Sequence, residues 1–333
     1  MSFFTTLLDF AGFVALLLWG TRMVQTGVQR AFGARLRSLL GAALNNRVKA
    51  FLAGVGVTAA LQSSTATGLM ASGFAAAGLV ELAPALAVML GANVGTTLIV
   101  QALSFDIAAV APVLVLGGVV MFKRDARSTI HDLGRAVIGV GLMLLALHHL
   151  LDVMTPLAAA PGLRAALATL AANPVLIVCL SALVAWAAHS SVAVVLLTMS
   201  LAAKGVASPE AAIALVLGAN LGAAINPMLE SASRGEPAAR RLPMGNLINR
   251  ALGVAIALAA LPLVAHATAA IDPDPARSVA NFHSLFNVAL AMIFLPLLNP
   301  YADLLRKLFP DRVDAADPAR PLYLDASARE TPI

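Results

Sequence analysis

Apolar stretches separated by short polar or basic loops cover the chain from about residue 6 to residue 300. Stretches of this length and composition predict membrane-spanning helices, because about 20 apolar residues cross the hydrocarbon core of a bilayer. The expected helices cover residues 6–29, 84–103, 107–122, 134–156, 210–229, 246–268 and 278–300. Two further apolar stretches, about 50–82 and 174–207, hold small polar residues near their centres. The pattern therefore predicts an all-α polytopic membrane protein with two unusual segments.

The polar residues in these two segments repeat each other. Gln62-Ser63-Ser64-Thr65-Ala66-Thr67 in the first has its counterpart 127 residues later in His189-Ser190-Ser191-Val192-Ala193. Each cluster is followed by an asparagine in a Gly-Ala-Asn-x-Gly motif, and Asn93 lies 31 residues after Gln62 just as Asn220 lies 31 residues after His189. Without a gap, residues 62–97 match residues 189–224 at 14 of 36 positions. The chain therefore contains an internal duplication.

Composition and charge narrow the class of protein. Hydrophobic residues make up 60% of the 333 residues and charged residues 12%, whereas soluble domains contain about 25% charged residues. No soluble catalytic domain is therefore expected. The net charge of +5 comes from arginines between apolar stretches, which indicates membrane orientation rather than nucleic-acid binding. Cys179 is the only cysteine, which excludes an intramolecular disulfide and gives no indication of a cysteine metal site.

Basic loops predict how the chain crosses the membrane. Loops 30–49 and 123–135 are both rich in arginine and lysine, and such short loops lie on the cytoplasmic side. Only two full helices follow residues 50–82 before the second loop, so the positive-inside rule favours entry and exit of residues 50–82 on one side, as a re-entrant hairpin with its tip near Gln62–Thr67. In the second half the basic loop comes at 234–241 instead. This reversal predicts inverted-topology repeats, each with a re-entrant hairpin and a broken helix.

The expected organisation has three parts. Residues 1–130 form the first membrane repeat, with its hairpin at about 50–82. Residues 131–300 form the second repeat and a terminal helix, with a hairpin at about 174–207, and residues 301–333 form a polar cytoplasmic tail. The N-terminus is then outside the cytoplasmic (inner) membrane and the C-terminus inside. Two tips entering from opposite faces are expected to meet near the midplane, where inverted-repeat transporters place their sites.

Neutral polar groups at such tips can bind ions. Hydroxyl, amide and carbonyl oxygens can replace the hydration shell of Na⁺, while N–H groups at helix N-termini favour an anion. No arginine or lysine lies near either tip in the sequence, so the site is expected to lack a fixed cation. Asn93 and Asn220 each lie between two glycines that weaken a helix, which favours a broken helix offering carbonyls to an ion. The alternatives are that the serines only pack helices and that the asparagines only bridge them.

The duplicated Gln-Ser-Ser motif, each copy followed by Gly-Ala-Asn-x-Gly, resembles the sodium/phosphate cotransporter family of type II carriers and their bacterial relatives. The resemblance implies a symporter of inorganic phosphate that uses Na⁺ as the coupling ion and needs no cofactor. It is compatible with an oligomer. It implies phosphate contacts from Gln62, Ser63, Ser64, Thr65, His189, Ser190 and Ser191. It implies sodium ligands from Gln62, Ser64, Thr67, Asn93, Thr96, Ser191 and Asn220. No counterpart of the phosphate-regulatory helical domain found at the C-terminus of many relatives is expected in residues 1–333.

Two positions depart from the family pattern, and several other interpretations stay open. His189 replaces the usual glutamine and is expected to be buried, and Val192 lacks the hydroxyl of Thr65. The cargo could be sulfate or a dicarboxylate, the His189-Ser190 pair could belong to an intramembrane hydrolase, or the protein could be structural or lipid-handling. Residues 281–287 are expected to form a polar packing face. Charged residues at helix ends are expected at the membrane interface: Arg22, Glu81, Glu210, Glu230 and Arg250.

Overall fold

A computed structural model describes residues 3–105, 108–124, 128–159, 172–232 and 237–310, and the secondary structure of these residues is entirely helical. The helices are α1 Phe3–Ala43, α2 Arg47–Leu61, α3 Ser64–Ala76, α4 Leu82–Leu103, η1 Ala108–Val110, α5 Ala111–Phe122, α6 Thr129–Ala159, α8 Pro174–Ala188, α9 Ser191–Ala203, α10 Pro209–Ala232, α11 Pro237–Ala259, α12 Leu261–Ile271, α13 Pro275–Phe294 and α14 Leu298–Leu308. Five of the described helices are long and apolar enough to span a membrane, or six if the bent pair α13 and α14 is one span. The chain is therefore an all-α, multi-pass membrane protein, as predicted.

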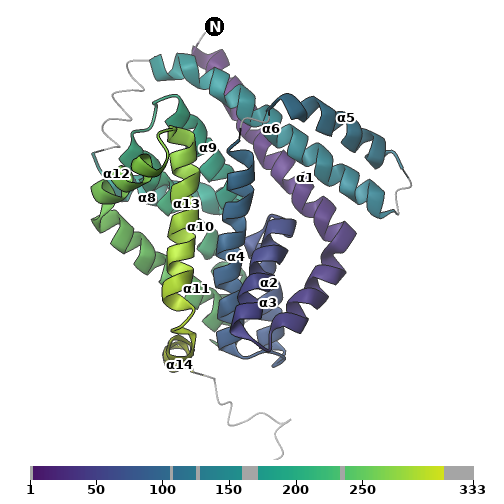
Figure 1. The fold of residues 1–333 in the computed structure, drawn as a ribbon, viewed down its shortest axis with the longest axis vertical. Coiled ribbons are helices and arrows are strands. Elements are labelled where there is room, and N and C mark those ends of the chain that lie inside the picture. Colours follow the sequence, from purple (N-terminus) through teal and green to yellow (C-terminus); the bar gives the residue numbers. More distant parts are fainter. Residues whose placement is uncertain (1–2, 106–107, 125–127, 160–171, 233–236, 311–333) are drawn as a thin grey trace, which may run out of the picture.

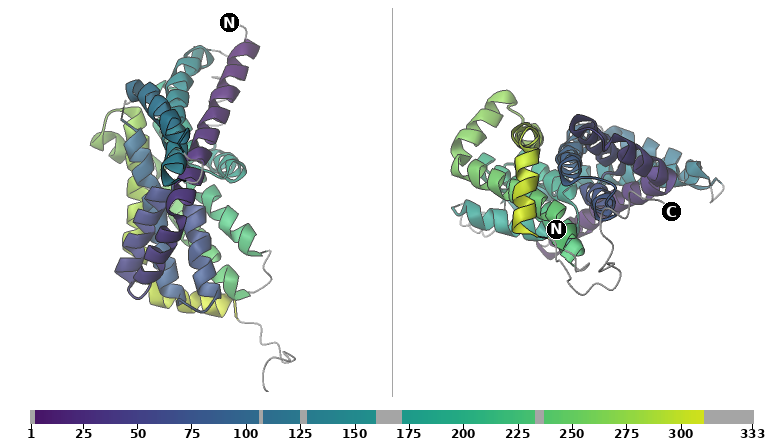
Figure 2. Two further views of the ribbon diagram at one scale, coloured as in Figure 1. Left: turned by 90° about the vertical axis from the view of Figure 1, so that its right-hand side faces the viewer. Right: turned by 90° about the horizontal axis from the view of Figure 1, so that it is seen from below.

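Two helices form the centre of the molecule, and the others pack around them (Figure 1). Helix α4 packs against α2 and α3, and α10 packs against α8 and α9. Helices α11 and α13 contact both α4 and α10. A separate group consists of α1 and α6, which cross each other, with α5 against α6. The N-terminal end of α1 extends above α2 and α4 in Figure 1 and in the left view of Figure 2.

The duplication extends through the local structure of the two halves. Helices α2 and α8 have 15 residues each, and α3 and α9 have 13 each. Asn46 and Asn173, which are 127 residues apart, both cap these hairpins by accepting backbone N–H groups. Gly78 and Gly205, at the same offset, both adopt positive φ, of 68° and 64°. Each half therefore contains the same unit of two short helices followed by one long helix.

The long helices of the two units are continuous, so the predicted break at Gly-Ala-Asn-x-Gly is wrong. Helix α4 runs through Asn93 and α10 runs through Asn220 without interruption. The glycines instead allow close packing, because a Cβ at Gly91 would overlap the carbonyl of Phe51 in α2. The equivalent Cβ at Gly218 would overlap the carbonyl of Val178 in α8. Small residues at a membrane helix interface commonly serve this purpose.

Three helix boundaries also differ from the prediction. Helix α1 continues to Ala43 instead of ending near residue 29. The expected helix 246–268 is divided, with α11 beginning already at Pro237 and α12 following after Ala259. The chain bends by 84° between α13 and α14.

The start of the predicted polar tail is wrong. Residues 301–308 belong to α14, and Leu298, Tyr301, Ala302 and Leu305 are all buried. Their spacing is that of an amphipathic helix with one apolar stripe. The Tyr301 hydroxyl also donates to the Gly245 carbonyl at 2.5 Å. Residues 311–333 of the predicted tail lie outside the described residues.

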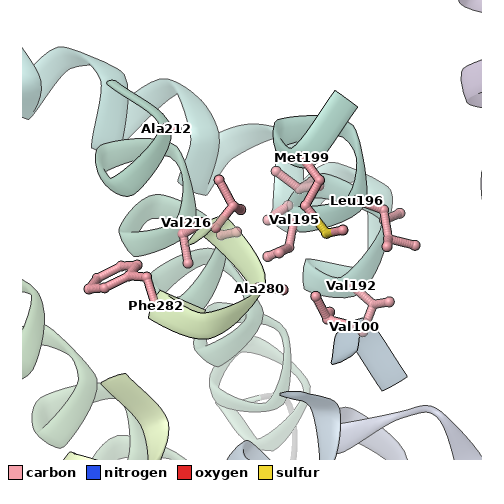
Figure 3. Close-up of a cluster of buried hydrophobic side chains, with 14 of the residues drawn as sticks. Val100, Val192, Val195, Leu196, Met199, Ala212, Val216, Ala280 and Phe282 are labelled. Carbon is pink, nitrogen blue, oxygen red and sulfur yellow. The ribbon is translucent and has the colours of Figure 1, made fainter. Parts of the chain in front are cut away.

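A hydrophobic cluster fixes the second hairpin to the centre of the molecule (Figure 3). Side chains of α9, including Val195 and Met199, gather against Val216 of α10 and Phe282 of α13. Val195 and Val216 are fully buried. Close packing of this kind holds the tip of α8 and α9 at a defined place relative to α10.

The glycine contacts lead to a stability prediction. Gly91→Ala and Gly218→Ala should each lower the stability of the folded protein by about 1–3 kcal/mol, the usual cost of overpacking. Gly56→Ala is the matched control, because a Cβ at this α2 glycine meets nothing within 4 Å. The control should be neutral or gain about 0.5–1 kcal/mol from helix propensity. Thermal unfolding of the detergent-purified variants measures the difference, and equal stability of all three variants would contradict the close packing.

Candidate functional site

Each polar cluster forms a tight break between two short helices. Gln62 follows α2 with φ 52° and ψ 30°, and His189 follows α8 with φ 52° and ψ 27°. They are the only non-glycine residues of the described chain with positive φ. The next residues, Ser63 and Ser190, are extended, and their hydroxyls cap α3 and α9 by accepting the N–H groups of Ala66 and Ala193. The chain thus reverses within two residues in both copies.

Polar side chains from other helices satisfy the carbonyls at these breaks. Gln25 of α1 donates its amide to the Gln62 carbonyl at 3.0 Å. Asn226 of α10 donates to the carbonyl of Trp186, in the last turn of α8, at 3.3 Å. Such partners stabilise the breaks, because an unpaired carbonyl within a membrane protein is costly; the Trp186 carbonyl also accepts the backbone N–H of His189 at 3.1 Å. The sequence interpretation missed both residues.

The two breaks meet around one small cavity of about 20 Å³, which we call the tip cavity. It is lined by Gln25, Gln62, Ser63, Ser64, Thr65, Thr96, His189, Ser190, Ser191, Val192, Ala223 and Asn226. All seven residues predicted to contact phosphate line this cavity. A volume of this size is on the scale of one water molecule, which needs about 10–15 Å³.

The predicted sodium ligands are only partly gathered at the cavity. Gln62, Ser64, Thr96 and Ser191 line it, whereas Thr67, Asn93 and Asn220 do not. The Thr67 hydroxyl instead accepts from Thr58 at 2.8 Å and donates to the Ser63 carbonyl at 3.1 Å, which stabilises the hairpin. The Gln62 side-chain oxygen is buried with no hydrogen-bond partner, so it is an open acceptor beside the cavity.

His189 does not fit the expectation that it is buried. The residue is exposed, and its Nδ1 lies 3.3 Å from the Ala187 carbonyl. It lines the tip cavity and also an adjoining cavity of about 370 Å³, together with Gln25 and Ser190. The adjoining cavity lies between α1 and the second break and includes Arg22. His189 is thus at the boundary between the tip cavity and a wider opening.

A larger cavity of about 530 Å³ lies elsewhere, where α6 and α9 approach the start of α13. Its charged residues have both signs, including Lys204, Asp152 and Arg277. Arg277 pairs with Asp272 at 2.6 Å, and this hydrogen bond is the main cause that lowers the pKa of Asp272. The mixture of charges makes this cavity a poorer candidate for an anion site than the tip cavity.

A buried polar cluster adjoins the tip cavity along α4 and α10. Its members are Asn93, Asn220, Asn246, Arg250 and Asn287, and each is at most 2% exposed. Asn93 donates to the Asn246 side chain at 2.9 Å, and Asn287 donates to the Asn220 side chain at 3.0 Å. Arg250 donates to the side-chain oxygen of Asn93 at 2.6 Å and to the carbonyl of Asn220. We call these five residues the polar cluster.

The place of Arg250 corrects one prediction. Arg250 was expected at the membrane interface, yet it is 1% exposed and donates to Asn93 of one repeat and Asn220 of the other. Helix α11 begins before residue 246, which moves Arg250 from a helix end to the middle of the apolar span Arg240–Ala259. An arginine in the centre of an apolar stretch was a signal in the sequence that its interpretation missed, because a buried charge at membrane depth is a candidate for a functional residue.

Other residues of the segment 281–287 pack against their neighbours as predicted. Gln101 of α4 donates to the side chains of Asn281 and Ser284 at 3.1 and 2.9 Å. His283 is fully buried, and neither of its ring nitrogens has a partner. The helix α13 therefore presents polar side chains to Gln101 of α4 over one turn.

The left-handed conformation at His189 can be tested separately from its imidazole. His189→Gly and His189→Val both remove the ring, but only valine is strained by a positive φ. The valine variant should be less stable than the glycine variant by about 1–2 kcal/mol. Thermal unfolding in detergent measures this difference, and the same pair of substitutions at Gln62 should behave alike. Equal stability within a pair would mean that the break has another backbone conformation.

Comparison with known proteins identifies relatives of the chain. A protein of Escherichia coli (strain K12), named "Putative inorganic phosphate export protein YjbB", is 40% identical over 327 residues, which cover 98% of this chain and 60% of that protein. The Salmonella typhimurium protein of the same name is 38% identical over 327 residues, which again cover 98% of this chain and 60% of that protein. "Uncharacterized protein YqeW" of Bacillus subtilis (strain 168) is 29% identical over 308 residues, which cover 91% of this chain and 98% of that protein. The chain thus spans about three fifths of the length of the first two relatives.

No solved structure matches the chain. The family model described as Na+/Pi-cotransporter matches residues 16–152 and again residues 149–297, in agreement with the internal duplication. Members of this family are transport proteins, so the intramembrane hydrolase is excluded. The chain belongs to the Na⁺/Pi-cotransporter family.

Proposed function

We propose that the protein is a sodium-coupled carrier of inorganic phosphate across the cytoplasmic membrane, and that the tip cavity is its substrate site. The observation that carries the proposal is the meeting of two equivalent helix breaks, one from each repeat, around a single cavity lined by hydroxyl and amide groups. A site built from both halves allows the two halves to move relative to each other and expose it in turn to either side. The name of the Escherichia coli relative supports phosphate as the cargo.

The N-termini of α3 and α9 suit an oxyanion. Each begins at the tip cavity, and each first turn contains backbone N–H groups without an intrahelical acceptor. The helix dipoles add partial positive charge at these ends, worth about 0.3–1 kcal/mol for each helix. Ser63 and Ser190 accept a backbone N–H as caps, and their hydroxyl hydrogens can still be donated to phosphate.

Sodium is best accommodated by the oxygens that line the tip cavity. The unpartnered side-chain oxygen of Gln62 and the hydroxyls of Ser64, Thr96 and Ser191 offer neutral oxygen ligands. Asn93 is a poorer ligand in this conformation, because its oxygen already accepts a hydrogen bond from a guanidinium group. Na⁺ bound beside phosphate would share the negative charge of the anion.

The volume of the tip cavity indicates that the structure is closed around the site. About 20 Å³ accommodates a particle the size of a water molecule or a bare cation. Phosphate has four oxygens around phosphorus and therefore requires the two breaks to separate. The adjoining cavity at His189 and Arg22 is the opening toward which they would separate.

Inverted topology and re-entrant hairpins remain part of the proposal. Helices of 15 and 13 residues are about 22 and 20 Å long, shorter than the hydrocarbon core of about 30 Å. Neither helix of a hairpin is therefore long enough to span the bilayer alone. The opposite charge of equivalent loops supports the inversion, with the N-terminus outside and the C-terminus in the cytoplasm.

Transport by the purified protein tests the proposed function. In proteoliposomes, uptake of labelled phosphate should be driven by an inward Na⁺ gradient and should fall to the level of empty liposomes when K⁺ or choline replaces Na⁺. Sulfate and succinate in excess should compete weakly. Phosphate flux that is indifferent to Na⁺, or flux of sulfate in its place, would refute the coupling or the cargo.

Serine substitutions test the tip cavity. Ser64→Ala and Ser191→Ala should each reduce Na⁺-driven phosphate flux at least tenfold, because both hydroxyls line the cavity and their removal changes packing little. Ser72→Ala is the matched control, since Ser72 is also a buried α3 serine but lies away from the cavity. Its flux should stay near that of the wild type. Normal flux in both tip variants would remove the tip cavity from the mechanism.

Cysteine labelling tests the inversion. Glu81 and Ser208 are repeat partners 127 residues apart, and both are exposed where a hairpin joins its long helix. In a Cys179→Ala background, an impermeant thiol reagent should label Glu81→Cys only from the cytoplasmic side and Ser208→Cys only from outside. The background change is needed because Cys179 is itself exposed. Labelling of both positions from the same side would refute inverted repeats.

A further inference from the structure

The guanidinium of Arg250 is a buried charge without a counter-charge. It is 1% exposed, and its partners are the neutral side-chain oxygen of Asn93 and the neutral carbonyl of Asn220. No carboxylate of the described chain pairs with it, and its Nε–H group has no partner. Removing a charge from water is costly unless an opposite charge compensates it. The arrangement is therefore incomplete without an anion.

The polar cluster holds Arg250 close to the tip cavity. Asn93 is three residues before Thr96, which lines that cavity, and Thr96 donates its hydroxyl to the Asn93 carbonyl at 2.7 Å. Asn220 is likewise three residues before Ala223, which lines the cavity from α10. Residues three apart in a helix are neighbours on one face. Arg250 is thus anchored one helical turn away from the cavity on both central helices.

The amide groups around Arg250 are oriented by further hydrogen bonds. Asn246 accepts the amide N–H of Asn93, which leaves the Asn93 oxygen facing the guanidinium. Asn287 donates to the Asn220 side chain from α13. The Asn93 oxygen that accepts from the guanidinium is therefore oriented from α11, and Asn287 connects α13 to the same polar cluster.

We infer that Arg250 is the fixed positive charge that balances the transported oxyanion, and that Arg250 rather than Na⁺ is the cation bound by Asn93 and Asn220. This inference rests on the proposed function in taking the tip cavity as the anion site. Arg250 acts as a positioning residue by its electrostatic potential, which is strong where water is excluded. Na⁺ is then left with the oxygens of the tip cavity itself.

Thermal stabilisation of the full-length protein in detergent measures anion binding directly. A ligand that binds only the folded state stabilises it by RT ln(1 + [L]/Kd), so the rise in unfolding temperature with ligand concentration reports the affinity. We expect phosphate, titrated at constant Na⁺ and ionic strength, to stabilise the wild type. Arg250→Met should weaken phosphate binding at least tenfold, whereas Arg250→Lys should remain within about threefold to fivefold of wild type because the charge is kept. Arg277→Met is the control. Arg277 lies outside the polar cluster and pairs with Asp272, so its replacement should not alter the affinity for phosphate.

Asn93→Asp distinguishes the inference from a sodium site and does not depend on removal of the arginine. A carboxylate at this position would pair with the guanidinium 2.6 Å away and neutralise it internally. If Arg250 balances the anion, phosphate binding should fall at least tenfold while the protein stays folded. If Asn93 and Asn220 instead bind Na⁺, the added negative charge should strengthen Na⁺ binding, seen as greater stabilisation by NaCl than by choline chloride.

Each result decides the inference. Loss of phosphate binding in Arg250→Met and Asn93→Asp, with retention in Arg250→Lys, supports it. Wild-type phosphate affinity in Arg250→Met, or stronger Na⁺ binding without loss of phosphate binding in Asn93→Asp, overturns it. Sulfate and succinate are titrated in parallel, so that a wild type stabilised only by one of these would refute phosphate as cargo while still testing Arg250 with that anion. A wild type stabilised by none of the three would overturn the inference as well.

Discussion

The structure depends on one constraint, which is that polar backbone groups exposed by a helix end must find partners inside the protein when hydrocarbon surrounds it. Ending α2 and α8 at Gln62 and His189 exposes carbonyls at the centre of the molecule, and ending them there also creates the N-termini of α3 and α9. Gln25 and Asn226 satisfy carbonyls, and Ser63 and Ser190 satisfy N–H groups. The residues of both breaks line the tip cavity. In the proposed function, the polar groups that make the breaks costly are those that would replace the water around a bound ion.

This constraint also explains why the long helices are unbroken. If α4 and α10 were interrupted at Asn93 and Asn220, a second set of backbone groups would need partners at the same depth. The glycines of the Gly-Ala-Asn-x-Gly motifs instead bring α4 within backbone contact of α2, and α10 within backbone contact of α8. Each hairpin is thus attached along the length of a rigid helix. The tip residues can then be held at defined positions by packing, although the hairpin helices are short.

The sequence predicted those features whose signal lies within one short stretch of residues, and it did not predict features that depend on contacts between distant helices. The duplicated motifs at equal spacing identified the residues of both tips, and apolar length located α4 and α10 to within two residues of their N-terminal ends. The role of the glycines was not predictable from α4 alone, because helix weakening and close packing require the same residue and only the position of α2 distinguishes them. Arg250 was misplaced because the basic residues at 234–241 suggested a loop that ended just before residue 246, whereas α11 already begins at Pro237 and includes Arg240 and Arg241. The hydrogen bonds from Gln25 and Asn226 join residues 37 and 40 positions apart, which no local pattern reveals.

The two repeats are equivalent at their tips but not in their charge. The position 127 residues before Arg250 is Lys123, an exposed residue at the end of α5. Helix α5 packs against α6 at the edge of the molecule, while α11 packs against α4 and α10 at its centre. Duplication therefore supplies two sets of hydroxyls and amides, but among the described residues only the second repeat supplies a buried cation. In the proposed arrangement, one guanidinium bound to asparagines of both repeats balances one anion between the two tips, and a second buried charge from the first repeat would add desolvation cost without a second anion to offset it.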